Sequence, residues 1–302
     1  MIKSNLYQKW VLSLDSATKR RELFFSQEYA KSFLIHTAID AKKNEHTLIK
    51  QFDFSKAKKL YNRTLSLGEA ACTLSHINIW RKLAEDEVAK FAIICEDDAL
   101  FSDNYFILFN IIEDWIRTNR INDIGFIIFG ESKVKSYKGK LKYRIGYPMQ
   151  FYPKIYKITD NQNRINKICV GELAKNYMCG TVGYIISNLC AKELIKYDKP
   201  YWLADDFEEI KRIIEDQTRK EIGIWHIYPR LVRERNNIVS TLEIERKKEQ
   251  KNSWGFFKYK VWTYIKFLLK CPLIYFFLRW KVMNQANKRA EIVLKDQINK
   301  NE

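Results

Sequence analysis

The sequence predicts an α/β fold built on one large sheet. Up to about residue 240, short runs of β-branched and aromatic residues alternate with stretches of helical periodicity, which is the pattern of such a fold. The chain has 302 residues, 46% of them hydrophobic, and this suffices to bury a substantial core. No internal repeat or low-complexity tract interrupts the pattern, so intrinsic disorder and fibrous repeats are excluded.

Each expected element follows from a local pattern of side chains. Continuous apolar runs at 91–95 and 124–129 indicate buried strands. Ser66, followed three residues later by Glu69 and then by an apolar-periodic stretch, is a capping-box signature for a helix running to about residue 85. The full set comprises strands at 10–14, 33–39, 91–95, 124–129 and 184–187, and helices at 17–29, 66–85, from near 104, at 189–197 and at 208–218, with loops and edge hairpins at 133–167.

The composition changes near residue 246. The last 57 positions hold 14 basic and 4 acidic residues, so they carry +10 of the total charge of +17. We therefore divide the chain into an α/β domain at 1–245 and a basic, aromatic helical appendage at 246–302. Aromatic and basic side chains of a helix at 253–270 suggest binding at a membrane interface. The alternative is that this face packs on the domain or on a second subunit.

The cysteines and the apolar runs indicate a chain that works inside the cell. The six cysteines form no CxxC pair, which favours a reducing compartment. The first apolar run, at 10–14, is too short for a signal peptide. The longest uncharged run of the aromatic tail, Cys271–Leu278, falls far short of the ~20 residues that a membrane span needs.

An acidic triplet, Glu96-Asp97-Asp98, directly follows the expected strand at 91–95. Ligands of open α/β sheets bind beyond the carboxyl ends of the strands, and carboxylates suit Mg²⁺ or Mn²⁺, which need only one or two of them besides phosphate oxygens and water. The triplet is therefore a candidate metal site. The alternative is an acidic turn that ends the strand and caps the following helix.

The sequence resembles glycosyltransferase family 25, the bacterial lipooligosaccharide sugar transferases and their collagen-modifying relatives, from about residue 10 to residue 246. Six segments carry the resemblance in the family's order, which is more specific than any one of them alone. They are Val11–Leu14 followed by Arg20 and Arg21; Gly68 to His76; Ile93 to Ala99 with the acidic triplet; Gly180 to Ser187 with Ala191; Ala204 to Phe207; and Tyr228-Pro229 leading to Ser240-Thr241.

The resemblance implies a GT-A type fold, a Rossmann-like nucleotide-binding sheet, and inverting transfer of galactose or glucose from a UDP-sugar to a lipooligosaccharide or lipopolysaccharide core glycan. Glu96 and Asp98 would hold the Mn²⁺ or Mg²⁺ that stabilises the departing UDP. Asp205 would be the base that deprotonates the acceptor, with Asp206 second and Glu131 third. Capping of the helix at 208–218 is the alternative for Asp205 and Asp206.

The same resemblance assigns the binding of the donor. Several of the expected residues also have an interpretation without donor binding. Adjacent helix arginines are usually solvated, a lone histidine on a helix is usually in the core, and a glycine can be present simply because the backbone turns there. The expected residues are Arg20, Arg21, Gly68, His76, Asp97, Gly180 and Thr181.

The resemblance also implies a location and partners. The partners would be a UDP-hexose, a lipid-linked oligosaccharide and the inner-membrane surface, with the protein on the cytoplasmic face. Nucleic-acid binding is disfavoured because no helix-turn-helix, zinc spacing or RNP-like motif accompanies the basic charge. Phosphoryl transfer is disfavoured by the lack of a GxxxxGK[ST] loop. An inactive scaffold or membrane binding protein with this fold stays the alternative, and the oligomeric state is open.

Overall fold

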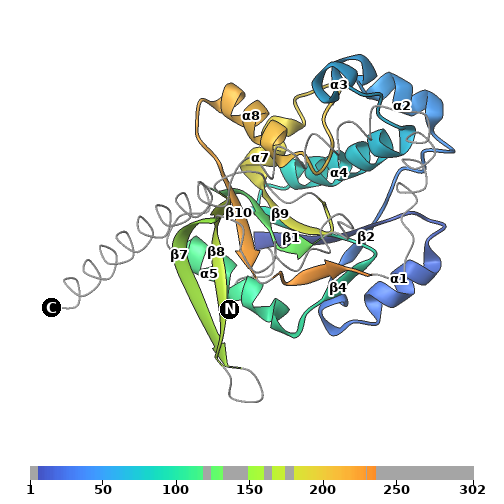
Figure 1. Cartoon of the computed structure of the whole chain (residues 1–302). Coiled ribbons are helices and arrows are strands. Elements are labelled where there is room, and N and C mark those ends of the chain that lie inside the picture. The colour runs from blue at the N-terminus through green and yellow to red at the C-terminus, as the bar shows by residue number, and fades with distance from the viewer. Residues whose placement is uncertain are drawn as a thin grey trace, which may run out of the picture. The chain divides into compact units, whose positions relative to one another are not determined.

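The computed structural model describes residues 6–117, 124–131, 149–159, 165–173, 180–228 and 230–235. Two compact units divide the chain. The first consists of residues 1–138 and 177–242, and the second of residues 139–176 and 243–302. Figure 1 labels the elements of both units, and each unit is described by itself.

The sheet of the first unit has five parallel strands and one that runs against them. Its order is β2-β1-β3-β9-β5-β10. β1 pairs in parallel with β2 and β3, and β5 does so with β10, whereas β9 is antiparallel to both β3 and β5. The carboxyl ends of the parallel strands therefore share one edge with the start of β9. The strands are β1 (Tyr7–Ser13), β2 (Leu34–Thr37), β3 (Phe91–Glu96), β5 (Ile124–Ile128), β9 (Gly183–Ser187) and β10 (Gly223–Tyr228).

Helices cover both faces of this sheet (Figure 1). On one face lie α2 (Glu45–Gln51), α3 (Phe54–Tyr61), α4 (Leu67–Glu85), α7 (Asn188–Leu194) and α8 (Phe207–Thr218). On the other lie α1 (Thr18–Phe25) and α5 (Ile107–Arg117), with the short 3₁₀ turns η2 (Glu28–Ala30) and η3 (Asp103–Phe106) beside them in the chain. A three-stranded sheet, β4-β11-β6, completes the unit, with β4 (Ala99–Phe101), β6 (Gly130–Glu131) and β11 (Val232–Glu234).

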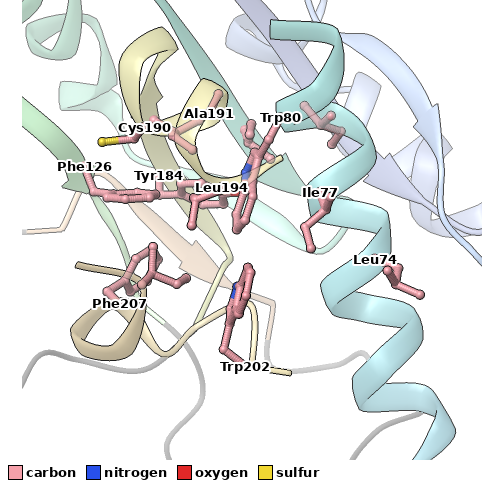
Figure 2. Packing of buried hydrophobic residues seen from close by; sticks show 14 of the residues in the cluster. Leu74, Ile77, Trp80, Phe126, Tyr184, Cys190, Ala191, Leu194, Trp202 and Phe207 are labelled. Atoms are coloured by element: carbon pink, nitrogen blue, oxygen red, sulfur yellow. The ribbon is translucent and has the colours of Figure 1, made fainter. Parts of the chain in front are cut away.

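The main core lies between the sheet and the helices α4, α7 and α8. Trp80 of α4 packs there with Tyr184 of β9 and with Trp202 and Phe207, all of them buried. Figure 2 shows Phe126 of β5 beside Tyr184 and Phe207, the two rings that it contacts, with Trp80 and Trp202 further across the cluster. Burial of side chains this large stabilises by about 1.5–3 kcal/mol each. These aromatic side chains therefore help to attach α4 and α8 to the sheet.

The predicted start of α4 is confirmed in detail. The side chain of Ser66 accepts a hydrogen bond from the backbone N–H of Glu69 at 3.2 Å, and the carboxylate of Glu69 accepts one from the backbone N–H of Ser66 at 3.0 Å. Arg63 donates to both oxygens of the buried Glu69 carboxylate at 2.8 and 2.9 Å. This fully used capping box fixes the start of α4. Since α4 ends only five residues before β3 begins, its start lies toward the opposite, carboxyl end of β3.

Most predicted elements of the first unit are found, within a few residues at their ends. The expectation of an edge hairpin within 133–167 is confirmed in part: in the second unit β7 (Met149–Thr159) pairs antiparallel with β8 (Ile165–Leu173). The elements α2, α3, β4, β6, β10 and β11 were not predicted. The expected appendage at 246–302 and its helix at 253–270 lie outside the described residues, and so does the boundary at 245, which stays a prediction.

Within the described ranges, no helix is long and apolar enough to cross a membrane.

Candidate active site

The shared edge of the sheet gathers most of the residues that the sequence singled out. β1 ends at Ser13 and leads into α1, which carries Arg20. β3 ends at Glu96, and Asp97 and Asp98 follow in the turn before β4. Thr181 lies just before β9, whose first residue, Gly183, is paired with Cys95 of β3. Three chain segments distant in sequence therefore meet at the acidic triplet.

Arg20 is the cationic partner of the triplet. One terminal nitrogen, Nη2, contacts Asp97 Oδ1 and lies 2.9 Å from Asp98 Oδ2. Ser13 Oγ donates to the other oxygen of Asp97 at 2.6 Å. Asp97 and Asp98 are buried, whereas the Arg20 side chain is 26% exposed. The two carboxylates are thus held in place by a residue that itself reaches the surface.

Glu96 is held differently from its two neighbours. Thr181 Oγ1 donates a short hydrogen bond to Glu96 Oε1. Burial, and then the negative charge of Asp98, raise the pKa of Glu96 to about 8, with a further contribution from Glu234. Like charges in a poorly solvated place cost free energy unless a proton or a cation is added. The edge is therefore suited to bind a cation.

Glu234 is a residue of this site that the sequence analysis missed. It lies on β11, where it pairs with Ala99 of β4, and the backbone N–H of the next residue, Arg235, donates to the carbonyl of Asp98 at 2.9 Å. A three-residue strand leaves no periodicity to detect, and Glu234 belongs to no motif. Only the pairing of β11 with β4 brings its charge to Glu96.

Two predicted glycines shape the backbone here. Gly180 has a φ of 117°, a conformation that residues with a Cβ rarely adopt, and it directly precedes Thr181. A Cβ on Gly183 would lie 2.5 Å from the ring of Phe129. A glycine turn therefore places the Thr181 hydroxyl on Glu96, and the prediction that Gly180 and Thr181 belong to the site is consistent with their position. Gly68 is buried in the first turn of α4, and its role in donor binding stays a prediction.

Arg21 is engaged with the backbone. Its two terminal nitrogens donate to the carbonyls of Leu14 and Asp15 at 2.6 and 2.8 Å. These bonds fix the connection between β1 and α1. Of the two adjacent arginines, Arg20 is the one that faces the triplet.

His76 lies in the core, which is the alternative left open for it. The ring is wholly buried, and its Nδ1 lies 2.8 Å from the Tyr184 hydroxyl, which also accepts a hydrogen bond from the Trp80 indole at 2.9 Å. Since the indole N–H fills one lone pair of Tyr184, the hydroxyl proton is available for Nδ1. This position gives no support to a role of His76 in donor binding.

Acid is expected to destabilise the protein through His76. Burial lowers the pKa of His76 to about 3 from an ordinary value of 6.5, so below pH 6.5 the unfolded chain takes up a proton that the folded protein does not. Stability is therefore lost as the pH falls, by about 2 kcal/mol at pH 5 from this residue. Thermal unfolding at pH 7 and pH 5 should show a smaller drop in His76→Gln than in the wild type. An equal drop in both would refute this account.

Asp206 has the capping role that was left open as an alternative. Its Oδ1 accepts from the backbone N–H of Glu209 at 3.2 Å, and its Oδ2 accepts from the Tyr61 hydroxyl at 2.8 Å. The Tyr61 oxygen also accepts from the backbone N–H of Leu203 at 2.9 Å. Both oxygens of Asp206 thus hold α8 and the segment before it, and this segment carries the half-buried Asp205.

The start of α8 points to the same edge of the sheet. α8 has 12 residues and ends at Thr218, and β10 begins at Gly223 and runs parallel to β5. A helix of this length spans about 18 Å, close to the length of the strand, so its first turn lies toward the carboxyl end of β10. Asp205 and Asp206 are therefore on the side of the sheet that carries the triplet.

Glu131, the third candidate base, ends β6. Its Oε2 lies 3.9 Å from Nε of the exposed Arg233 on the neighbouring strand β11. An exposed ion pair at that separation contributes little to stability. A surface ion pair accounts for this position of Glu131 as well as a catalytic role does.

The donor set fits a hard divalent cation bound together with a ligand. Glu96 and Asp98 offer carboxylate oxygens at the edge, and the like charges around them favour a cation. Among the described residues, however, no group of three or more His, Cys, Asp or Glu side chains is placed to hold a metal ion. Such a site would need phosphate oxygens or water to complete it, which is common for Mg²⁺.

This fold and this site define a class. A mixed α/β sheet with an acidic triplet after an inner strand, beside a glycine turn and an arginine, is the architecture of GT-A type glycosyltransferases. The chain belongs to glycosyltransferase family 25 (LPS biosynthesis protein), whose family model matches residues 7–208. The expected family and the expected α/β fold class are thereby confirmed.

Two curated relatives come from Haemophilus influenzae. The lipooligosaccharide biosynthesis protein lic2B is 28% identical over 202 residues, 63% of this chain and 62% of the relative. The lipooligosaccharide biosynthesis protein lex-1 of strain Rd is 30% identical over 139 residues, 46% of this chain and 39% of the relative. The chain thus matches less than two thirds of the length of either relative.

Among solved structures, the chain is similar to a 4-diphosphocytidyl-2C-methyl-D-erythritol synthase from Anaerococcus prevotii. The sequence identity is 12%, and the match covers 82% of this chain and 100% of the other, with a TM-score of 0.35. At this TM-score the likeness supports no conclusion about function.

Proposed function

We propose that the protein transfers a hexose, galactose or glucose, from a UDP-sugar to a lipooligosaccharide or lipopolysaccharide core glycan with inversion at the anomeric carbon. The observation that carries the proposal is the acidic triplet at the carboxyl edge of the sheet, in contact with Arg20 and Thr181, in a chain of glycosyltransferase family 25. The names of the two Haemophilus relatives support lipooligosaccharide as the class of acceptor.

Glu96 and Asp98 would hold Mn²⁺ or Mg²⁺ in this proposal. When bound, the cation would supply Lewis-acid stabilisation of the negative charge that develops on the leaving diphosphate. The chain's own part is to keep these carboxylates at a fixed place. Thr181 orients Glu96, while Ser13 and Arg20 orient the intervening Asp97.

Arg20 has one N–H group available to bind the UDP-sugar. Its Nε is buried and has no hydrogen-bond partner in the described part of the chain. A buried N–H without an acceptor costs about 1–3 kcal/mol, and a guanidinium binds phosphate through two parallel N–H donors. A diphosphate oxygen at this place would satisfy Nε. Arg20 is therefore our candidate for contacting UDP.

Asp205 is our candidate for the base that removes the proton of the acceptor hydroxyl. Inversion needs one carboxylate on the face of the sugar opposite the leaving group. The contacts of Asp206 with the helix cap and with Tyr61 count against Asp206 as the base, whereas Asp205 is the position that matches the Asp of the family motif. We keep the cytoplasmic face of the inner membrane as the proposed location, since a lipid-linked acceptor would be reached there.

The test is UDP release from a panel of UDP-sugars, with Mn²⁺ or with EDTA and a lipooligosaccharide core glycan as acceptor. We expect turnover with one hexose donor, dependent on the acceptor and lost in EDTA. Product anomeric configuration, read by NMR, checks inversion. If no sugar nucleotide binds or turns over across a broad set of acceptors, the alternative of an inactive scaffold at the membrane replaces this proposal.

A further inference from the structure

We propose that Arg20 and a divalent cation are alternative partners of Asp98: the guanidinium takes the cation's place in the free protein and turns to the diphosphate when nucleotide and cation bind. The inference rests on the proposed function, because it assumes that a diphosphate and a cation meet at this edge. It adds a device that couples the binding of the two.

The contacts of Arg20 carry the first step. A single nitrogen, Nη2, bridges Asp97 Oδ1 and Asp98 Oδ2. Asp97 has a second partner in Ser13, so it stays hydrogen-bonded if the guanidinium moves. A cation on the Asp98 carboxylate would have to share this crowded place with the positive charge of Arg20. Simultaneous close contact of both with Asp98 is therefore unfavourable.

The charge balance of the edge gives the second step. The acidic triplet and Glu234 lie together at this edge, and Arg20 is the cation in contact with Asp97 and Asp98. In the free protein, the positive charge of Arg20 thus balances part of this negative charge. An internal counter-ion lowers the affinity of the edge for free metal ions, so the cation binds more weakly without its nucleotide.

The remaining donors of Arg20 give the third step. Nε is buried without a partner in the described part of the chain, while about a quarter of the side chain is exposed. The guanidinium therefore lies at the boundary between the carboxylates and the open edge, with a donor still to be filled. A short rotation about the side-chain torsions exchanges one anionic partner, Asp98, for another, a phosphate. Because such coupling is reciprocal, UDP then raises cation affinity and the cation raises UDP affinity.

The experiment measures binding by the full chain and needs no turnover. Mn²⁺ is titrated without nucleotide, with free Mn²⁺ read by electron paramagnetic resonance, into the wild type, Arg20→Met and Arg20→Gln. Lys19→Met is the matched control, since it removes one positive charge from an exposed neighbour on the same helix. We expect both Arg20 variants to bind Mn²⁺ about tenfold more tightly than the wild type, the size of a charged hydrogen-bonded interaction. Lys19→Met should change the affinity less than twofold, by the weak screened effect of a surface charge.

A second titration follows UDP binding in EDTA. Arg20→Met and Arg20→Gln should bind UDP about tenfold more weakly, because a charged phosphate contact is lost, while Lys19→Met should bind it like the wild type. Arg20→Gln keeps a donor for Asp98 and serves if Arg20→Met does not fold. An unchanged or weaker Mn²⁺ affinity in the folded Arg20 variants overturns the inference alone. If the wild type binds no UDP with or without Mn²⁺, the proposed function fails instead.

Discussion

Replacing Asp98 with Asn is expected to reduce sugar transfer by about a thousandfold, because removing one group that stabilises charge at the leaving diphosphate costs about 10²–10³ in rate and a cation ligand is lost with it. Asp98 lies in the turn after β3, buried and 2.9 Å from Arg20. The measurement is the initial rate of UDP release from the donor identified in the panel, at saturating Mn²⁺.

Asp98→Asn should not destabilise the folded protein. Asp98 adds negative charge beside Glu96 and contributes to the raised pKa of that group, so its neutralisation relieves repulsion while Arg20 keeps Asp97 as a partner. We expect Asp98→Asn to unfold at or above the wild-type temperature, as is common where a site trades stability for function. Asp103→Asn, an exposed carboxylate five residues further on, is the control and should keep full activity. A rate within tenfold of the wild type in Asp98→Asn would remove Asp98 from the mechanism.

The sequence predicted the parts of the fold that local patterns determine. The strand at 91–95 and the helix from Ser66 were predicted because a fully apolar run and a reciprocal capping box are both complete within a few residues. The short helices α2 and α3, of seven and eight residues, were missed, since few turns give little periodicity. β10 was missed because Gly223 and His226 interrupt its apolar run.

The site was predicted in the same uneven way. Motif order identified the triplet, Arg20 and the turn of Gly180 and Thr181, and the structure brings these together. The order of the motifs does not tell whether a residue lies at the edge of the sheet or in the core. His76 was therefore expected at the donor site, although it lies in the core. Glu234 was missed for the opposite reason: it belongs to no motif, and only a long-range strand pairing places it near Glu96.

Asp205 and Asp206 differ in their surroundings although they are adjacent in sequence. Both Asp206 oxygens are used, one by the N–H of Glu209 at the start of α8 and one by Tyr61. Losing a side-chain cap costs about 0.5–2 kcal/mol, and the loss of the Tyr61 bond adds about 1 kcal/mol. Asp206→Ala should therefore lower the free energy of unfolding by about 1–3 kcal/mol.

For Asp205 the expected effect is on the rate. If Asp205 is the base, Asp205→Ala should lower kcat by about 10²–10⁴, the usual contribution of a positioned general base. Asp206→Ala, assayed well below its unfolding temperature, should stay within tenfold of the wild-type kcat. The reverse result, with catalysis lost in Asp206→Ala and retained in Asp205→Ala, would assign the base to Asp206 and leave Asp205 without a catalytic role.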